Sequence, residues 1–262
     1  MKIIDCHCHI YPDKIAPKAV ESIRKFYDIP MKCGGTTEEL LTQGIKYGVE
    51  KMLVHSTATR GDQVVGINNF LISELSAHPE FIGYGTLHPS FSDNEKELDR
   101  LIKNGVKGIK FHPDFCRIDV LSKGMYEIYE MISGKLGIMF HVGDDRHPYS
   151  QPQKIQKILH DFPHLTVIGA HMGGYTAWEE SYNILCGENL YFDTSSSLAF
   201  IAPSLAEKII RKHGVEKILF ATDYPMWYLK DEIELFLKIP LNDDEREKIF
   251  YKNAEQLLGL FK

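Results

Sequence analysis

Histidines, a lysine and an aspartate recur near the ends of short apolar runs in this sequence. A His-x-His pair, His7 and His9, closes the first run, and Asp223 follows the last. Residues placed in the same way between them are Lys110, His112, His141 and His171. Imidazole and carboxylate groups together suit zinc, iron or manganese, and a catalytic zinc ion needs about three or four protein ligands with one position open to water. We therefore expect a divalent-metal site among these residues.

The elements that position these residues follow a regular series. Short β-rich runs alternate with longer helical stretches, which is typical of parallel βα units. We expect strands near 2–8, 51–56, 81–87, 106–112, 137–142, 165–171, 189–194 and 217–223. Helices are expected near 13–26, 36–48, 62–78, 92–104, 120–135, 150–162, 175–186 and 203–213, and within 229–260. No linker or low-complexity segment interrupts the series, so we predict a single domain over residues 1–262.

Eight βα units can close into a barrel or form an open doubly wound sheet. The open sheet predicts a glycine-rich phosphate turn after its first strand, but this sequence has His-Cys-His there. The length of 262 residues matches the ~250 residues of a (β/α)₈ barrel. We therefore predict an α/β fold, a (β/α)₈ TIM barrel whose strand ends converge on one mouth. Because side chains alternate along a strand, His7 and His9 share one face, whereas Cys6 and Cys8 face the helices.

Local signals mark several boundaries of these helices. Thr36 followed by Glu39 predicts a capping box at the start of the second helix. Gly105, Gly137 and Gly214 follow helical stretches and are expected to end them in left-handed turns.

Composition restricts the classes of partner. The net charge of -6 argues against broad nucleic-acid binding, which usually needs a basic face. No apolar run approaches the ~20 residues of a membrane helix, and the start of the chain lacks the features of a signal peptide. Five cysteines without a disulfide spacing suit a reducing compartment. We expect a cytoplasmic protein that binds neither membranes nor nucleic acid.

Six segments carry a family resemblance: IIDCHCHIYP, GIKFHPDF, FHVG, IGAHMGG, NLYFDTSS and FATDYP, in this order. On these the sequence resembles the amidohydrolase superfamily, and within it the amidohydrolase-2 group, similar to aminocarboxymuconate-semialdehyde decarboxylase. Asn253-Ala254 with Leu257-Leu258-Gly259 is similar to the closing helix of the family. The resemblance covers nearly the whole chain.

The resemblance implies roles for individual residues. His7, His9, His141 and Asp223 match the ligands of one divalent metal ion, for which we expect zinc, and Asp223 also shuttles a proton. His171 matches the histidine that polarises the substrate in one-metal members or binds a second metal in two-metal members. Lys110 stands where some members carry a carbamylated lysine that bridges two metals. We expect one ion and an unmodified Lys110; two ions, with the second bound through Lys110 and His171, are the alternative.

The resulting functional hypothesis is a metal-dependent hydrolase. A divalent metal lowers the pKa of a bound water towards ~7, so attack on an amide, lactone or ester carbonyl of a small molecule is expected. The first alternative is a non-oxidative decarboxylase with the same ligands. A TatD-type nuclease is more distant, because it would carry a carboxylate in place of Lys110, and a metal-binding protein without turnover is a further alternative. Candidate substrate contacts are Lys110, His112, Arg60 and Trp227, although Arg60 can instead pair with Asp62. The resemblance also implies a homodimer.

Overall fold

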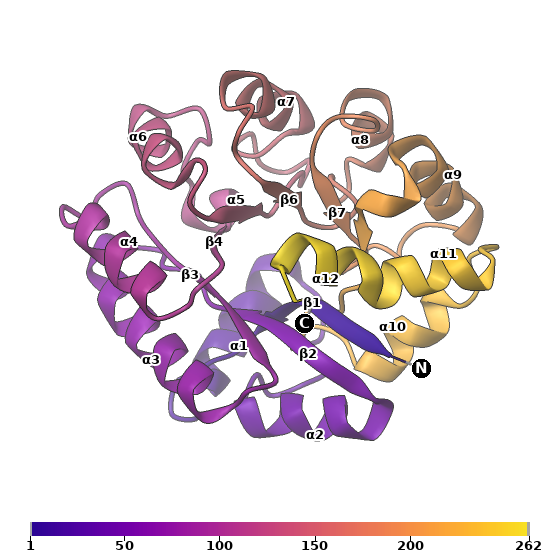
Figure 1. Cartoon of the computed structure of the whole chain (residues 1–262), viewed down its shortest axis with the longest axis horizontal. Coiled ribbons are helices and arrows are strands. Elements are labelled where there is room, and N and C mark those ends of the chain that lie inside the picture. The colour runs from indigo at the N-terminus through magenta and orange to yellow at the C-terminus, as the bar shows by residue number, and fades with distance from the viewer. Residues whose placement is uncertain (1, 261–262) are drawn as a thin grey trace. The chain divides into compact units, whose positions relative to one another are not determined.

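The computed structural model describes residues 2–260 and contains eight strands that alternate with helices (Figure 1). The strands are β1 (Ile3–His9), β2 (Val49–His55), β3 (Phe81–Gly85), β4 (Gly108–Phe111), β5 (Gly137–Phe140), β6 (Val167–Gly169), β7 (Tyr191–Asp193) and β8 (Ile218–Leu219). They form one sheet in the order β1 to β8, and the pairs from β3 to β7 are parallel. Every predicted strand is present in the described residues, and the fold is the predicted (β/α)₈ TIM barrel.

The helices also follow the prediction, with two differences. Their bounds are α1 (Ala16–Tyr27), α2 (Thr37–Tyr47), α3 (Val64–Ala77), α4 (Asn94–Lys103), α5 (Pro113–Cys116), α6 (Lys123–Ile132), α7 (Pro152–Asp161), α8 (Trp178–Ile184), α9 (Pro203–His213), α10 (Leu229–Phe236), α11 (Asp243–Glu247) and α12 (Asn253–Leu258). The short helix α5 was not expected. The last stretch is broken after α10, near Pro240, and a π-helical turn over Lys248–Lys252 joins α11 to α12. None of the helices in residues 2–260 is long and apolar enough to cross a membrane.

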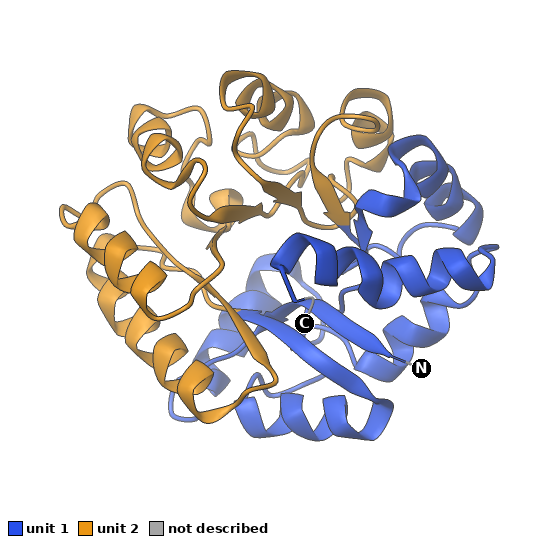
Figure 2. Cartoon of the chain, in the orientation of Figure 1, with its two compact units in different colours: residues 1–54, 193–262 blue, residues 55–192 orange. Residues whose placement is uncertain are grey.

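The chain divides into two compact units (Figure 2). Unit 1 comprises the described residues of 1–54 and 193–262, and unit 2 comprises residues 55–192. The expectation of a single domain over residues 1–262 stays a prediction.

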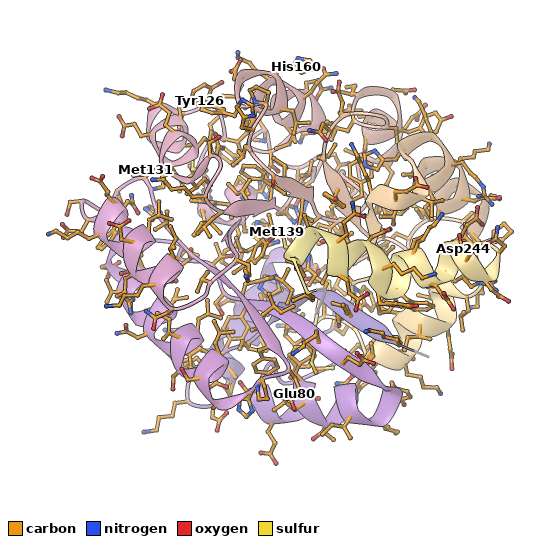
Figure 3. All side chains as sticks on the ribbon, in the orientation of Figure 1. Glu80, Tyr126, Met131, Met139, His160 and Asp244 are labelled. Carbon is orange, nitrogen blue, oxygen red and sulfur yellow. The ribbon has the colours of Figure 1, made fainter. Side chains whose placement is uncertain are left out.

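In unit 2, both faces of the parallel strands are buried, mostly through apolar side chains. The register pairs Ile109 with Ile138 and Lys110 with Met139 across β4 and β5, and all four side chains are fully buried. Helices α3, α4, α6, α7 and α8 lie outside these strands (Figure 1), and cover one side of parallel strands that are buried on both sides. Met139 lies inside the unit, whereas His160 of α7 is exposed at its surface (Figure 3).

In unit 1, the first strand hydrogen-bonds to the segment of the last. The amide of Cys6 donates to the carbonyl of Phe220 (3.0 Å), and the amide of Asp223 donates to the carbonyl of His7 (2.9 Å). The buried carboxylate of Asp5 accepts from the amide (3.0 Å) and the hydroxyl (2.7 Å) of Thr222. These bonds fix Asp223 beside the His-x-His pair.

The structure differs from some of the predicted helix-boundary signals, namely the capping box at Thr36 and the helix ends at Gly137 and Gly214. Thr36 accepts a bond from the amide of Glu39 (3.4 Å) as expected, but the Glu39 carboxylate accepts from the amide of Gly34 (2.6 Å) instead of reaching back to Thr36. Gly105 has a φ of 78°, as a left-handed turn requires, whereas Gly214 ends α9 with a positive φ of 104° but a ψ of 121°, outside the left-handed region. The prediction for Gly137 is wrong, because Gly134 takes the positive φ of 73° and Gly137 is the first residue of β5.

Candidate metal centre

Three donor atoms converge in unit 1. The Nε2 atoms of His7 and His9 are 3.2 Å apart, and Oδ1 of Asp223 lies 3.3 Å from each of them. Ligands bound at ~2.0 Å in a tetrahedral zinc site are separated by ~3.3 Å. The three atoms therefore form one face of a site that fits a single divalent ion, and their imidazole and carboxylate chemistry suits it.

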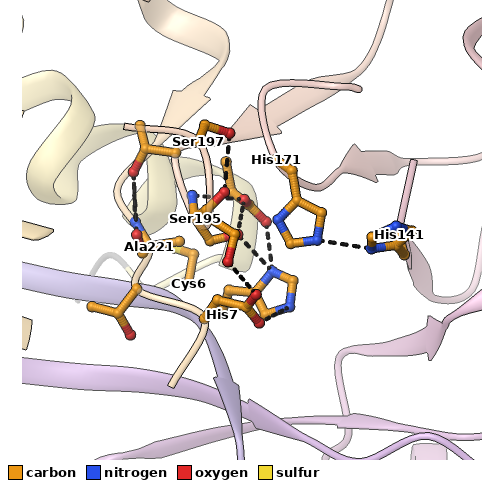
Figure 4. A network of polar contacts seen from close by, with 12 residues as sticks. Cys6, His7, His141, His171, Ser195, Ser197 and Ala221 are labelled. Carbon is orange, nitrogen blue, oxygen red and sulfur yellow. Dashed lines mark hydrogen bonds and ion pairs between the residues drawn. The ribbon is translucent and has the colours of Figure 1, made fainter. Parts of the chain in front are cut away.

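His7 is oriented by a buried aspartate at the end of β7 (Figure 4). Its Nδ1 lies 2.9 Å from Oδ2 of Asp193 and 3.2 Å from Oγ of Ser195. Ser195 in turn donates to Oδ1 of Asp193 through its hydroxyl (2.5 Å) and its amide (3.1 Å). Because a carboxylate can only accept, the hydrogen bond places a proton on Nδ1 of His7. The lone pair of His7 is then on Nε2, the atom that faces Asp223.

Asp223 is held from its other side. Its Oδ2 accepts a hydrogen bond from the Ser196 hydroxyl (2.6 Å), and Trp227 Nε1 donates to the same hydroxyl oxygen (2.9 Å). Trp227 is half-buried and also packs edge-to-face on Phe200, with ring centroids 5.8 Å apart. The aromatic pair of Trp227 and Phe200 is thus connected to Asp223, a candidate metal ligand, through the hydroxyl group of Ser196.

Burial changes the ionisation of groups next to this cluster. Desolvation raises the pKa of Asp5 to about 6, although its hydrogen bond from Thr222 acts in the opposite direction. Desolvation also raises the pKa of Tyr11, and the nearby charge of Asp223 adds to the shift. The Tyr11 ring is parallel to that of His9, with centroids 6.5 Å apart. Tyr11 is therefore a neutral phenol beside the ligand cluster.

A second group of histidines lies in unit 2. Nε2 of His171 is 2.9 Å from Nδ1 of His141 (Figure 4), and the ring of His112 stacks on that of His141, with centroids 4.0 Å apart and planes at 10°. His112 also accepts a bond at Nδ1 from the amide of Phe115 (3.1 Å) and so caps α5. An amide N–H can only donate, so the neutral His112 ring carries its proton on Nε2, from which it can donate a hydrogen bond.

Glycines shape the loops that carry His141 and His171. Gly143 has φ 92°, and a Cβ there would lie 2.5 Å from the carbonyl oxygen of Tyr175. Gly173 has φ 72°, and a Cβ there would lie 2.3 Å from the ring of Phe192. His171 itself has a left-handed φ of 62°, a conformation that costs energy in residues other than glycine and is often found at functional sites. The close approach of the Tyr175 backbone explains Gly143 in FHVG, and the close approach of the Phe192 ring explains Gly173 in AHMGG.

Two of the predicted substrate contacts, Lys110 and Arg60, differ in their exposure to solvent. Lys110 is fully buried on β4, as a residue lining the inside of a barrel would be. Arg60 is exposed, and its guanidinium pairs with Asp62 through two bonds of 3.0 and 3.1 Å. The ion pair considered for Arg60 is therefore present, and a role for Arg60 in substrate binding stays a prediction.

Sequence reasoning missed the residues that orient the ligands: Asp193, Ser195 and Ser196. They lie in the segment NLYFDTSS, which carried the family resemblance without any residue being assigned a role. A run of small polar residues directly after a predicted strand is the signal that could have indicated them.

Histidine and carboxylate groups at the strand ends of a (β/α)₈ fold are features of the metal-dependent barrel enzymes. A family model described as Amidohydrolase, amidohydrolase-2, matches residues 4–260. The chain therefore belongs to the amidohydrolase-2 family, as the resemblance implied. No curated protein matches its sequence.

Solved structures with the same fold include an uncharacterised TIM-barrel protein from Bordetella bronchiseptica, at 21% identity and TM-score 0.79, covering 99% of both chains. A dihydroxybenzoic acid decarboxylase from Polaromonas sp. JS666, with bound manganese and the inhibitor 2-nitroresorcinol, is 16% identical with TM-score 0.77, covering 99% of this chain and 97% of that chain. A 5-carboxyvanillate decarboxylase from Sphingomonas paucimobilis is 14% identical with TM-score 0.76, covering 98% of this chain and 99% of that chain. At these identities the likeness shows the fold.

Proposed function

We propose that this protein is a metal-dependent decarboxylase of a small carboxylated substrate, with His7, His9, His141 and Asp223 as metal ligands. The observation that carries the metal is the triangle of two imidazole nitrogens and one carboxylate oxygen with edges of 3.2 to 3.3 Å. The support for decarboxylation comes from the similar structures, which include decarboxylases of two aromatic acids. We prefer it for that reason to hydrolysis, which the sequence favoured.

His141 is added to the three ligands by an argument from the fold. The C-terminal ends of barrel strands converge on one mouth, and His141 directly follows β5. A proton on its Nδ1, donated to Nε2 of His171, leaves a lone pair on Nε2 for the metal. We expect Zn²⁺ because histidine-rich sites suit it; Mn²⁺, which the Polaromonas enzyme binds, is compatible with the same donors.

The residues of the chain have distinct roles in this proposal. When bound, the metal polarises substrate oxygen atoms as a Lewis acid. The carboxyl group of Asp223, whose Oδ2 is held by Ser196, carries the proton. Breaking the bond to the carboxylate leaves its electron pair on the substrate carbon, which takes the proton from Asp223 as CO₂ departs. Hydrogen bonds from His171 and His112, together with the charge of Lys110, stabilise the negative charge on the substrate.

Hydrolysis of an amide, lactone or ester is the second candidate. It is favoured by the position of Asp223 Oδ1, which lies 3.3 Å from both imidazole nitrogens and can accept a proton from a water molecule that attacks a carbonyl carbon. The two reactions need the same ligands and differ in the substrate that docks. A nuclease is not proposed, because Lys110 stands where a carboxylate would be required. A small-molecule substrate, a cytoplasmic location and a homodimer remain part of the proposal.

The test begins with the metal content of the purified protein. Protein loaded separately with Zn²⁺ and Mn²⁺ is then assayed for CO₂ release from 2,6-dihydroxybenzoate and 5-carboxyvanillate, and for acid release from a panel of lactones, esters and amides. The metal-stripped protein is the control. We expect metal-dependent CO₂ release; metal-dependent hydrolysis with no CO₂ release would establish the second candidate, and a protein that takes up no divalent metal would overturn both.

A further inference from the structure

A chain of three hydrogen-bonding groups leads from the surface of unit 1 to a candidate metal ligand. It consists of Trp227 Nε1, the hydroxyl of Ser196 and Oδ2 of Asp223, joined by distances of 2.9 and 2.6 Å. Ser196 and Asp223 are buried, whereas Trp227 is half-buried. The reaction proposed above assigns no role to Ser196 beyond its contact with Asp223.

The direction of this chain follows from the chemistry of its members. An indole N–H can only donate, so the hydroxyl oxygen of Ser196 accepts from Trp227. Ser196 therefore has its single proton left to donate, and its two neighbours are Oδ2 of Asp223 at 2.6 Å and Sδ of Met226 at 3.2 Å. A carboxylate is a much stronger acceptor than a thioether. The proton points to Asp223.

This direction distinguishes the two oxygen atoms of Asp223. Oδ2 is occupied by a hydrogen bond from a donor that is itself polarised by Trp227. Oδ1 faces the Nε2 atoms of His7 and His9 at 3.3 Å. Without Ser196, Oδ2 would lose this hydrogen bond, and the two oxygens would no longer be distinguished by it.

The backbone conformations of Ser196 and Asp223, which make this hydrogen bond, cost conformational energy. Ser196 has φ 46° and Asp223 has φ 61°, both in the left-handed region that residues other than glycine rarely adopt. Such conformations persist only where surrounding interactions hold them, and they are frequent at functional sites. Glycine at position 196 would relieve the backbone but would remove the hydroxyl group.

We propose that Ser196 is a positioning residue that presents Asp223 to the metal through Oδ1 alone, and that Trp227 fixes the direction of its hydrogen bond. This inference rests on the proposed metal site. Groups that orient a metal ligand typically change metal affinity by ~10- to 100-fold when they are removed. Because Trp227 packs on Phe200, the same residue also connects an aromatic surface to the orientation of Asp223.

The experiment compares metal binding by the full-length native protein, Ser196→Ala and Ser196→Gly. Co²⁺ affinity is measured by competition with a chromophoric chelator, and the visible absorption of bound Co²⁺ reports its coordination number. Ala keeps the backbone cost and removes the hydroxyl, whereas Gly removes both. Ser197→Ala is the matched control, since Ser197 is equally buried in the same segment but donates to the carbonyl of Ser195. Trp227→Phe removes the indole donor and keeps a smaller aromatic ring next to Phe200.

We expect Ser196→Ala and Ser196→Gly to weaken Co²⁺ binding to a similar degree, at least ~10-fold, and to change the Co²⁺ spectrum. The Gly variant should unfold at a temperature equal to or above that of the Ala variant, which separates loss of the hydroxyl from loss of stability. Trp227→Phe should show a smaller loss of affinity, and Ser197→Ala should bind as the native protein does. Native affinity and spectrum in Ser196→Gly would overturn the inference while leaving the metal site intact. A native protein that binds no Co²⁺ would instead overturn the proposed function and this inference with it.

Discussion

Oδ2 of Asp193 lies 2.9 Å from Nδ1 of His7, across the ring from the Nε2 atom that faces Asp223. A carboxylate in this position fixes the tautomer of a ligand histidine and increases its basicity. We expect Asp193→Ala to lower metal affinity by ~10- to 100-fold, measured by chelator competition. Ser195→Ala, which removes one donor to Asp193, should cause a smaller loss. Unchanged affinity in Asp193→Ala would show that His7 needs no orienting partner.

The proposed ligands can be removed one at a time. Because a site of about four ligands has little redundancy, we expect His7→Ala, His9→Ala and His141→Ala each to reduce bound metal and abolish turnover. Elemental analysis of the purified variants measures the first effect. His141 is the informative member, since the other three proposed ligands already lie together; full metal content in His141→Ala would remove it from the ligand set.

Asp223 has two roles that one substitution can separate. Asp223→Asn keeps an oxygen that can coordinate a metal but loses the group that carries a proton. We therefore expect bound metal to remain, while turnover falls by ~10²- to 10⁴-fold, the usual contribution of general acid–base catalysis. Measurement at saturating metal excludes weak loading as the cause. Native turnover under those conditions would show that another group moves the proton.

The number of metal ions depends on Lys110. We expect one equivalent per chain, retained in Lys110→Ala, because a single ion needs no bridging carbamate. If Lys110 is carbamylated and bridges two ions, the native protein should contain two equivalents and the variant should lose one. Inductively coupled plasma mass spectrometry of both proteins decides between these outcomes.

Asp114 predicts a pH dependence of stability in unit 2. Burial raises the pKa of this carboxyl to about 7, although hydrogen bonds from Ser150 and Tyr149 oppose the shift. Its pKa in the unfolded chain is ~3.9, so the folded protein binds the extra proton between these values. The free energy of unfolding should fall as pH rises from ~4 to 7.

The Asp114→Asn variant cannot ionise, so the fall in its free energy of unfolding over this pH range should be smaller than in the native protein. Urea denaturation at pH 5 and pH 8 measures the difference, and the largest gain in stability over the native protein should occur at pH 8. Asp99→Asn, a change on the exposed face of α4, is the control. Equal destabilisation of Asp114→Asn at both pH values would contradict the prediction.

The sequence predicted the strands well because each is a short apolar run whose residues are buried from both sides, such as Ile138 to Phe140 of β5. The candidate metal ligands could be found for a related reason, since histidine and aspartate residues at the ends of apolar strands are seldom needed for packing.

The boundaries of the helices were less predictable. Helix α5 depends on His112 accepting a bond from the amide of Phe115, and no helical periodicity can appear in four residues.

The orienting residues could not be derived from local patterns. Asp193 follows His7 by 186 residues, and neither residue type indicates the other as its partner. Glu39 shows the same limitation at a helix start. Its spacing from Thr36 predicted a reciprocal cap, but the amide of Gly34 bonds its carboxylate and the Tyr224 hydroxyl lies 3.3 Å from it. Contacts between segments distant in sequence decide which of several local possibilities is realised.

The pairing of the first strand with the last segment has a consequence for biosynthesis. Asp5 and Thr222, whose side chains bond to one another, are 217 residues apart. A ribosome adding ~5 to 20 residues per second needs on the order of 10 to 40 s to cover that interval. Until then the nascent chain contains its His-x-His pair without Asp223. Metal loading into the proposed triangle is therefore expected only after residue 223 has been synthesised, and a translation product that stops before it lacks the carboxylate of the triangle.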